Sequence, residues 1–192
     1  DEVQVFNRAL AEADVHQTFL AGPYGLRKNQ APVAAASAAP NPADATGPDG
    51  ATVTLDGTGS SDPDGDPLSY TWREGQTPLG TGHTLPVLLS LGSHVITLTV
   101  DDGRFETDSS TVTVEVRDTT APVLTLLGAN PLTVEGATPF IDPGATAFDT
   151  VAGDLTTQIQ VTGTVNPLVV GSYTLTYTVS DGINTATAIR TV

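Results

Sequence analysis

Apolar and polar residues alternate along most of the chain, and this alternation predicts β-strands. The runs SHVITLTVDD (93–102) and TVTVEVRD (111–118) carry apolar side chains at every second position. Gly and Pro, with 19 and 14 copies, separate such runs, and no helical periodicity is sustained beyond the first twenty residues. Many short strands joined by turns are typical of an all-β fold.

The expected strands form two groups. The first group comprises 31–37, 51–57, 68–74, 94–101 and 109–117. The second group comprises 122–127, 131–135, 145–149, 158–162, 171–180 and 183–192. Each group ends in a long strand, an Asp-Gly turn and another alternating strand, which makes a weak internal repeat of roughly 80–90 residues. We therefore expect two tandem immunoglobulin-like β-sandwiches, residues 29–118 and 119–192, with Trp72 anchoring the first core.

The first 28 residues have a different pattern. Residues 1–7 alternate as a single strand, and residues 9–20 predict a short helix that Gly22-Pro23 ends. A lone strand and helix cannot bury a core, so they must pair with something beyond this segment. The stretches DEV, FNRAL and ADV resemble the C-terminal strand and helix of a laminin-G-like jelly roll. That resemblance implies an upstream jelly-roll domain, a linker ending near residue 28 and a longer, processed parent protein.

The charge of the chain excludes two classes of partner. The net charge is −15, and residues 31–118 alone carry thirteen acidic and three basic residues, a net charge of −10. Such a surface repels phosphate backbones and anionic membranes, so we expect no nucleic acid and no membrane insertion. The chain has no Cys, which excludes disulfides and thiolate metal sites. A small extracellular module must then be stabilised by other means, and bound calcium is one of them.

One loop carries the strongest candidate chemistry. Asp62, Asp64 and Asp66 occupy alternate positions of SSDPDGDP, directly before the strand that contains Trp72. Calcium binds six to eight oxygens, and alternate carboxylates on a turn can converge on such an ion. The loop is not an EF-hand, because no Glu stands at the twelfth position. The alternative is a solvated turn, since Asp-Pro-Asp-Gly forms turns without any metal.

The residues around this loop resemble a PKD domain, an immunoglobulin-like module of prokaryotic surface proteins and secreted hydrolases. The resemblance is carried by NQAPVA (29–34), LDGTGSSDPDG (55–65), YTW (70–72) and LTVDDG (98–103). The family often has WDFGDG where this chain has WREGQ (72–76). The resemblance implies that calcium is held by Asp62, Asp64 and Asp101, with the Asn29 amide oxygen and a Gln30 carbonyl. Asp66 and Asp102 are additional candidate ligands.

The last unit resembles a bacterial Ig-like domain. The matching stretches are DPGATA (142–147), GDLT (153–156) and GSYTLTYTVSD (171–181). A second cation site is conceivable here, if the side chains of four acidic residues gather near the linker: Asp118, Asp149, Asp154 and Asp181. The alternative is that each carboxylate caps its own turn, and we favour that alternative.

The sequence gives poor support to catalysis. His16, His83 and His94 share no spacing with Ser or Asp that indicates a triad, and no HExxH motif occurs. We expect a non-catalytic, calcium-stiffened spacer or adhesion stalk of a larger prokaryotic protein, secreted or at the cell surface. Its partners would be neighbouring domains of the same polypeptide or neighbouring subunits.

Two other functions stay open. In the first, the chain is a fibre subunit whose residues 1–7 complete a neighbour's sheet by strand addition. In the second, it is an accessory module of a secreted hydrolase that binds a polysaccharide, a matrix protein such as collagen or another surface protein, which requires an exposed aromatic platform.

Overall fold

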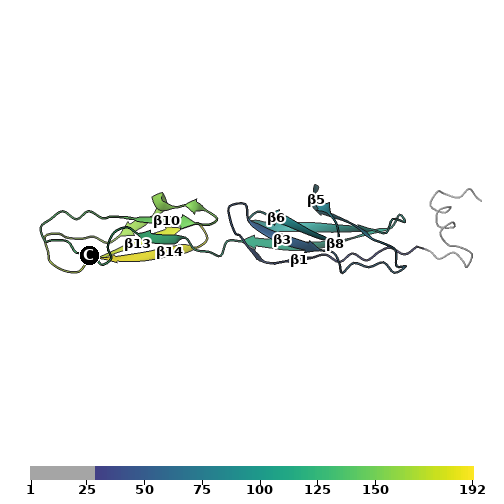
Figure 1. The fold of residues 1–192 in the computed structure, drawn as a ribbon, viewed down its shortest axis with the longest axis horizontal. Coiled ribbons are helices and arrows are strands. Elements are labelled where there is room, and N and C mark those ends of the chain that lie inside the picture. The colour runs from purple at the N-terminus through teal and green to yellow at the C-terminus, as the bar shows by residue number, and fades with distance from the viewer. Residues whose placement is uncertain (1–28) are drawn as a thin grey trace, which may run out of the picture. The chain divides into compact units, whose positions relative to one another are not determined.

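A computed structural model of the chain describes residues 29–192, and all the regular elements of this part are strands apart from one 3-10 helix (Figure 1). The all-β prediction is confirmed. The strand expected at 1–7, the helix expected at 9–20 and the laminin-G-like interpretation lie outside the described residues.

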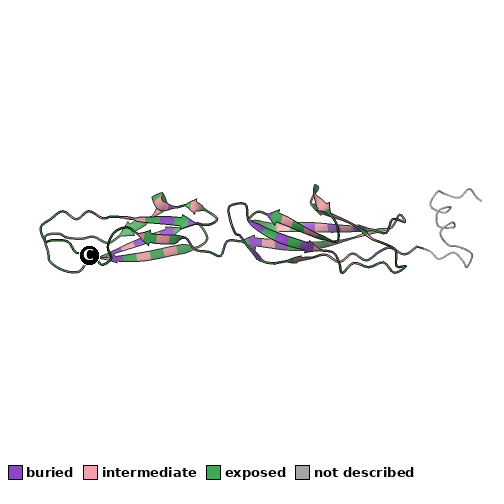
Figure 2. Ribbon diagram, viewed as in Figure 1, coloured by how far each residue is buried: buried purple, intermediate pink, exposed green. Residues whose placement is uncertain are grey.

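The first sandwich consists of two sheets. One sheet has the order β1-β3-β6 and the other has the order β2-β8-β7-β4-β5. Their strands are β1 (Ser37–Ala39), β2 (Ala43–Asp44), β3 (Ala51–Asp56), β4 (Ser69–Glu74), β5 (Thr77–Thr81), β6 (Thr84–Leu89), β7 (Gly92–Asp101) and β8 (Thr107–Arg117). Burial alternates with the period of two that the sequence predicts, and Figure 2 shows this alternation along the strands.

Trp72 is fully buried on β4, as the sequence predicts. Its indole Nε1 donates a hydrogen bond to the Gly82 carbonyl at 2.9 Å, so the single polar atom of the side chain is satisfied. Gly57, next to β3, is required at this point. A Cβ on Gly57 would lie 2.8 Å from Leu98 Cδ2 and 3.3 Å from the indole of Trp72.

The structure adds strands that the pattern does not reveal. Strands were expected in four places where β3, β4, β7 and β8 occur, but 31–37 is mostly irregular and keeps only β1 and an isolated bridge between Val33 and Ser61. The additional strands β5 and β6 contain Pro78 and Pro86, and both are edge strands. Proline has no N–H to donate, so it is tolerated at a sheet edge and hides the strand pattern in the sequence.

The second sandwich also has two sheets, with the orders β11-β10-β9 and β12-β13-β14. The strands are β9 (Val123–Leu126), β10 (Ala145–Asp149), β11 (Gly153–Asp154), β12 (Gln160–Thr162), β13 (Thr174–Ser180) and β14 (Thr185–Thr191), with the 3-10 helix η2 (Thr156–Gln158). The strand expected at 131–135 does not form. Leu132 N donates one hydrogen bond to Thr191 O, but Pro131 has no N–H and no ladder follows.

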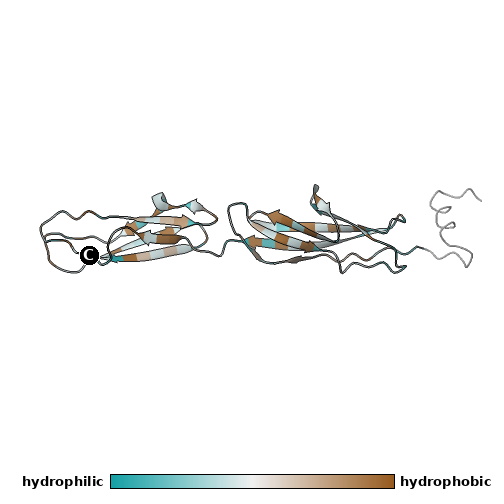
Figure 3. Ribbon diagram, viewed as in Figure 1, coloured by the Kyte–Doolittle hydropathy of each residue, from teal (hydrophilic) through white to brown (hydrophobic). Residues whose placement is uncertain are grey.

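A buried arginine lies among the strands of the second sandwich. Arg190 on β14 is fully buried, and its guanidinium donates to the carbonyls of Leu127, Ala129 and Gly144 at 2.6–2.9 Å and to Tyr177 Oη at 3.0 Å. Figure 3 shows hydrophilic and hydrophobic segments on the same strands. Because its donors find acceptors, the charge is tolerated inside the domain. The sequence pattern did not identify this residue.

Tyr177 supports the same arrangement. Its hydroxyl donates to Asp142 Oδ1 at 2.5 Å, and Asp142 lies 3.4 Å from Arg190 Nε. Burial and the hydrogen bond to Asp142 raise the pKa of Tyr177, so the phenol remains protonated. A smaller apolar cluster of Ala147, Leu155 and Val179 completes the core.

Candidate metal centre

The Asp loop, residues 57–68, joins β3 to β4 and is shaped by its own first carboxylate. Asp62 Oδ1 accepts hydrogen bonds from Asp64 N at 2.7 Å and Asp66 N at 3.2 Å. Gly65, with φ of 81°, permits the left-handed bend that closes the turn. As a result, one carboxylate oxygen from each of Asp62, Asp64 and Asp66 lies within 4.8 Å of the others. The convergence expected from the alternate spacing is therefore present.

The segment that leads into the sandwich is attached to this loop. Gln30 donates from its backbone N to Asp64 Oδ2 at 2.8 Å and from its side chain to Asp64 Oδ1 at 3.1 Å. Asn29 donates from Nδ2 to Asp102 Oδ2 at 2.7 Å. Gln30 thus contacts the Asp loop and Asn29 contacts the turn after β7, the end of the sandwich where the sequence places both residues. Gln30, however, contributes hydrogen-bond donors rather than a carbonyl.

The turn after β7 supplies Asp102. Its Oδ1 accepts hydrogen bonds from Arg104 N at 2.6 Å and Glu106 N at 3.2 Å, and the residue is 2% exposed. Burial by itself would raise the pKa of Asp102, but the hydrogen bonds from Asn29 and the two backbone amides outweigh burial and hold the pKa below its ordinary value. Asp102 is therefore an ionised, buried carboxylate.

Asp101 has a different position from the one the PKD resemblance implied. Its Oδ1 accepts Gly103 N at 2.7 Å within its own turn, and its oxygens are not part of the Asp62, Asp64 and Asp66 group. Side-chain direction alternates along β7, so Asp102 shares the inward parity of Val100 and Asp101 takes the opposite parity. The structure accordingly gives Asp102 the inner place and leaves Asp101 on the turn.

Three buried acceptor oxygens indicate what kind of ligand the Asp loop and its neighbours can bind. Asn29 Oδ1, Asp62 Oδ2 and Asp66 Oδ2 are buried, and no hydrogen-bond donor in residues 29–192 reaches them. Arg104 neutralises part of the charge, because its guanidinium lies 2.7 Å from Asp66 Oδ1. An all-oxygen donor set with buried, unpaired acceptors fits a hard cation such as calcium and does not fit a thiophilic metal.

The four acidic residues singled out in the second unit separate into two groups. Asp154 is exposed and caps Thr156 N at 2.9 Å, and hydrogen bonds from Thr156 lower the pKa of Asp154. Asp118, Asp149 and Asp181 lie together, with oxygens within 4.8 Å of one another. Each of these three also caps a turn with Oδ1, so turn capping and convergence occur at once.

The described histidines take structural positions. His94 Nε2 lies 2.9 Å from Ser90 O, and the exposed His83 ring meets Tyr70 edge to face at 6.2 Å. His16 lies outside the described residues. The Ser90 contact of His94 involves the backbone oxygen rather than the hydroxyl that a triad would use.

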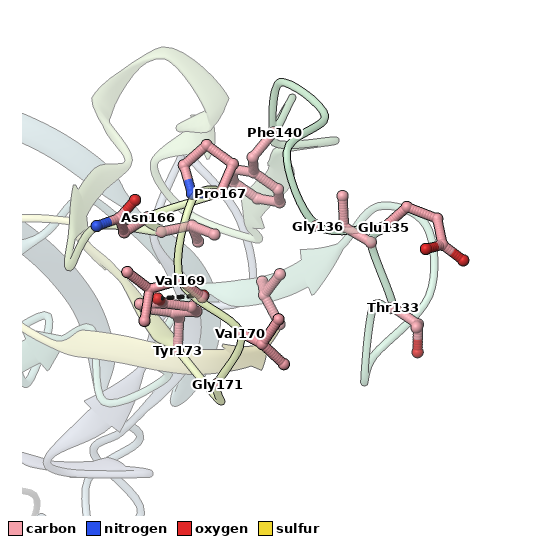
Figure 4. Close-up of a pocket in the computed structure, with 13 residues that line it drawn as sticks. Thr133, Glu135, Gly136, Phe140, Asn166, Pro167, Val169, Val170, Gly171 and Tyr173 are labelled. Atoms are coloured by element: carbon pink, nitrogen blue, oxygen red, sulfur yellow. Dashed lines mark hydrogen bonds between the residues drawn. The ribbon is translucent and has the colours of Figure 1, made fainter.

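A pocket of about 280 Å³ opens in the second sandwich between residues 133–140 and 165–173 (Figure 4). Phe140, Pro167 and Val170 supply much of its apolar wall, and Glu135 is the one charged side chain among its lining residues. Tyr173 Oη donates to Val169 O at 2.7 Å, which ties the phenol to the wall. The pocket therefore presents no acid–base pair for catalysis.

Two family models match the chain. Residues 29–115 match the bacterial Ig domain, and residues 124–192 match the Ig-like domain of bacterial surface proteins. Domains of this kind are typically non-catalytic and belong to extracellular or cell-surface proteins. Among residues 29–192, no helix has the length and apolar character that crossing a bilayer requires.

Several solved structures are similar to this chain. The PKD1 domain of Vibrio anguillarum Epp is 30% identical and aligns with 47% of this chain and 100% of its own, with a TM-score of 0.37. Carbohydrate-binding modules of the β-sandwich superfamily are 19% identical over 79% of this chain and 56% of theirs, with a TM-score of 0.43. Fibronectin(III)-like modules of Clostridium thermocellum CbhA are 11% identical over 82% and 92%, with a TM-score of 0.35.

A search of curated proteins found none that matches this chain. The two family matches and the two observed sandwiches agree in fold and order along the sequence. Residues 29–192 are therefore a tandem of two bacterial immunoglobulin-like domains.

Proposed function

We propose that this chain is a non-catalytic, calcium-stiffened spacer or adhesion stalk within a larger extracellular bacterial protein. The observation that carries the proposal is the set of three buried acceptor oxygens, on Asn29, Asp62 and Asp66, that no donor of residues 29–192 reaches. Burying such atoms unpaired destabilises a folded domain, whereas coordination to a cation satisfies them.

Three residues of the first domain would supply calcium ligands. Asp62 and Asp66 hold the ion from the loop, and Asn29 holds it from the leading segment. Calcium supplies a divalent charge that all of these oxygens can share. Asp64 and Asp102 already attach the leading segment through Gln30 and Asn29, so an ion at this pole locks an existing contact. The direction in which the chain enters the first domain would then be fixed.

The composition leaves a role for calcium in the stability of this chain. The chain has no Cys and a net charge of −15, so neither disulfides nor a neutral surface contributes to its stability. Extracellular calcium modules typically bind the ion with dissociation constants of about 0.1–1 mM, a range that extracellular calcium can saturate.

Neither alternative function gains a specific observation. The strand that would be added to a neighbour, residues 1–7, lies outside the described residues. Glycan binding requires an exposed aromatic platform. In the pocket of Figure 4, Phe140 is half-buried and the hydroxyl of Tyr173 is bonded to Val169 O. The strongly exposed aromatic rings of the described residues, Phe105 and Phe148, belong to different domains, so they do not form one platform.

The test compares thermal unfolding of the whole chain in calcium chloride and in EDTA. We expect EDTA to lower the melting temperature of the first domain, and small-angle scattering to show a broader distribution of particle dimensions. Asp62→Asn retains Oδ1, which caps the loop, but removes the charge. It should abolish the calcium-dependent part of the stability.

The matched control is Asp49→Asn, which makes the same charge change at an exposed turn of the same domain. It should leave the calcium response intact. A first domain that melts at the same temperature in calcium and EDTA, in both the parent chain and Asp62→Asn, would refute the proposal.

A further inference from the structure

We infer that Asp118, Asp149 and Asp181 form a second calcium site, in the second domain and independent of the first. Asp118 follows β8 directly, Asp149 is the last residue of β10 and Asp181 follows β13 directly. One carboxylate oxygen from each residue lies within 4.8 Å of the others. The second site does not depend on the proposed function, because it uses none of the residues of the first.

The burial of these carboxylates requires a compensating charge. Asp149 is 2% exposed and Asp118 is 4% exposed. Asp149 Oδ2 is buried, and no hydrogen-bond donor of residues 29–192 reaches it. The ion pairs formed by the described arginines involve other carboxylates, Asp66, Glu115 and Asp142. Buried carboxylates in folded proteins are paired or bind a metal, and no side chain described here supplies the pairing.

The backbone holds the three carboxylates in place with one oxygen each. Asp149 Oδ1 accepts from Val151 N at 2.7 Å and Ala152 N at 2.8 Å. Asp181 Oδ1 accepts from the amides of the turn between β13 and β14 at 2.6–2.7 Å. Asp118 Oδ1 accepts from Thr120 N at 3.1 Å. Fixing one oxygen in this way orients the carboxylate in advance, so little side-chain freedom remains to be lost when an ion binds.

The Asn184 amide brings Asp118 to the other two. Its Nδ2 lies 3.3 Å from Asp118 O, 3.2 Å from Thr120 O and 3.2 Å from Asp181 Oδ2. Residues 118–120 form the segment that leaves β8, and their carbonyls are thereby attached to the turn after β13. The cluster thus joins three separate stretches of chain through one side chain and three carboxylates.

The geometry selects the class of ion. The donor set is oxygen alone, which favours a hard divalent cation over zinc or copper. Oxygens that lie within 4.8 Å of one another can share one calcium ion, whose calcium–oxygen distances are about 2.3–2.6 Å. Calcium also accepts irregular sets of six to eight oxygens, whereas magnesium requires near-ideal octahedral geometry. Water and nearby carbonyls would complete a calcium shell that the three carboxylates begin.

A calcium ion bound by the three carboxylates would attach the linker residue Asp118 to the loops that follow β10 and β13. Without the ion, three like charges repel one another and the linker is held mainly by Asn184. The second domain would therefore have its own calcium dependence, separate from the Asn29 and Asp62 pole of the first domain.

The primary test is a calcium titration of the whole chain followed by amide NMR shifts. We expect saturable shifts at the amides that bond to the cluster: Thr120, Val151, Ala152, Ile183 and Asn184. Shifts at Gln30, Asp64 and Asp66 report the first site separately. Calcium shifts confined to the first domain would overturn the inference, while shifts confined to the second would overturn the first site alone.

A variant pair tests the stoichiometry by calorimetry. Asp149→Asn keeps Oδ1 as the acceptor for Val151 N and Ala152 N and removes one charge. We expect the number of bound calcium ions to fall by one and the shifts of the second domain to disappear. Asp154→Asn, an exposed cap in the same domain, should leave the number of bound ions unchanged. An unchanged stoichiometry in folded Asp149→Asn would refute the site. Should that variant fail to fold, the titration of the parent chain decides alone.

Discussion

The two domains share a fold but distribute their stability differently. In the described part of the chain, twelve buried apolar residues belong to the first domain, including Trp72, whereas five belong to the second. The first domain buries one charged residue, Asp102, whereas the second buries Arg190 and Asp149, and Asp118 is buried at the linker. A small apolar core leaves more of the stability to polar and ionic contacts. The second domain should therefore be more sensitive to losing a charge partner.

The acidic clusters of the two domains also differ in how far basic and amide side chains compensate their negative charge. In the first domain, Arg104 lies against Asp66 and Gln30 donates twice to Asp64, so the chain itself compensates part of the charge. In the second domain, the carboxylates that pair with the described arginines are others than Asp118, Asp149 and Asp181. An acidic cluster with its own arginine can persist without a metal, whereas one without an arginine depends more strongly on the ion.

The largest effect should come from Arg190→Met. The change leaves the carbonyls of Leu127, Ala129 and Gly144 without their donor and Asp142 without its cation. Breaking such a buried arrangement costs about 3–5 kcal/mol. Calorimetry should show the second domain melting far below the first. Arg117→Met, at an exposed pair with Glu115, should cost less than about 1 kcal/mol. Equal effects of the two variants would contradict the assigned role of Arg190.

Removing calcium should have the next largest effect and should act more strongly on the second domain. An ion at a hundred times its dissociation constant stabilises the folded state by about 2.7 kcal/mol. In the first domain part of that gain is offset, because calcium competes with Arg104 and Gln30 for the carboxylates. Calorimetry in EDTA should thus lower the second transition more than the first, and added calcium should restore both. If EDTA lowered the melting temperature of the first domain more than that of the second, the prediction that the second domain depends more on calcium would be wrong.

Acid should weaken both domains chiefly through Asp102 and Asp181, since Asp56 and Asp154, whose pKa values are also lowered, are screened by solvent. The folded-state pKa values of Asp102 and Asp181 lie below the ordinary value of 3.8; burial opposes this lowering, and hydrogen bonds outweigh burial. A lowered folded pKa gives stability that is complete above 3.8 and is lost as the pH falls through the folded value. Urea unfolding in EDTA should therefore weaken below about pH 4.

Two variants test which carboxylate causes the loss of stability at low pH in each domain. Asp102→Asn should flatten the response of the first domain only, and Asp181→Asn that of the second only. An acid response that survives both substitutions would show that other carboxylates carry it.

The smallest effect should come from Arg104→Gln. Removing the guanidinium from Asp66 costs the first domain less than about 1 kcal/mol in EDTA, since the arginine is partly exposed. The freed carboxylate should then bind calcium several-fold more tightly, which titration calorimetry measures. The second site, which has no such arginine, should keep its affinity. Weaker calcium binding in the first domain would mean that Arg104 assists the site.

Much of the fold could be predicted from the sequence, because long alternating runs such as those of β7 and β8 encode strand and face together. The Asp loop was predictable for a similar reason, since its three carboxylates are adjacent in the sequence and need only a turn to meet. The strands β5 and β6 were not predictable, because Pro78 and Pro86 interrupt their pattern.

The polar residues were harder to predict. Arg190 is isolated in an alternating strand, and a pattern of residue types does not reveal which carbonyls surround a guanidinium. The choice between Asp101 and Asp102 depends on which face of β7 is buried beyond its last residue. Asp118, Asp149 and Asp181 are separated by about thirty residues each, and each has the local sequence of a turn cap. Their convergence becomes visible only in three dimensions.

The prolines at the two edges of the first sandwich have a consequence for proteins displayed in crowded arrays. An exposed strand edge presents unpaired N–H and C=O groups that can recruit a strand from another molecule. Here one sheet ends in β5 with Pro78 and the other has an edge at β6 with Pro86. Each proline leaves its edge strand with one N–H fewer, which makes that edge a poorer template for a strand from another molecule. Dense packing of identical copies is thereby less prone to fuse their sheets into aggregates.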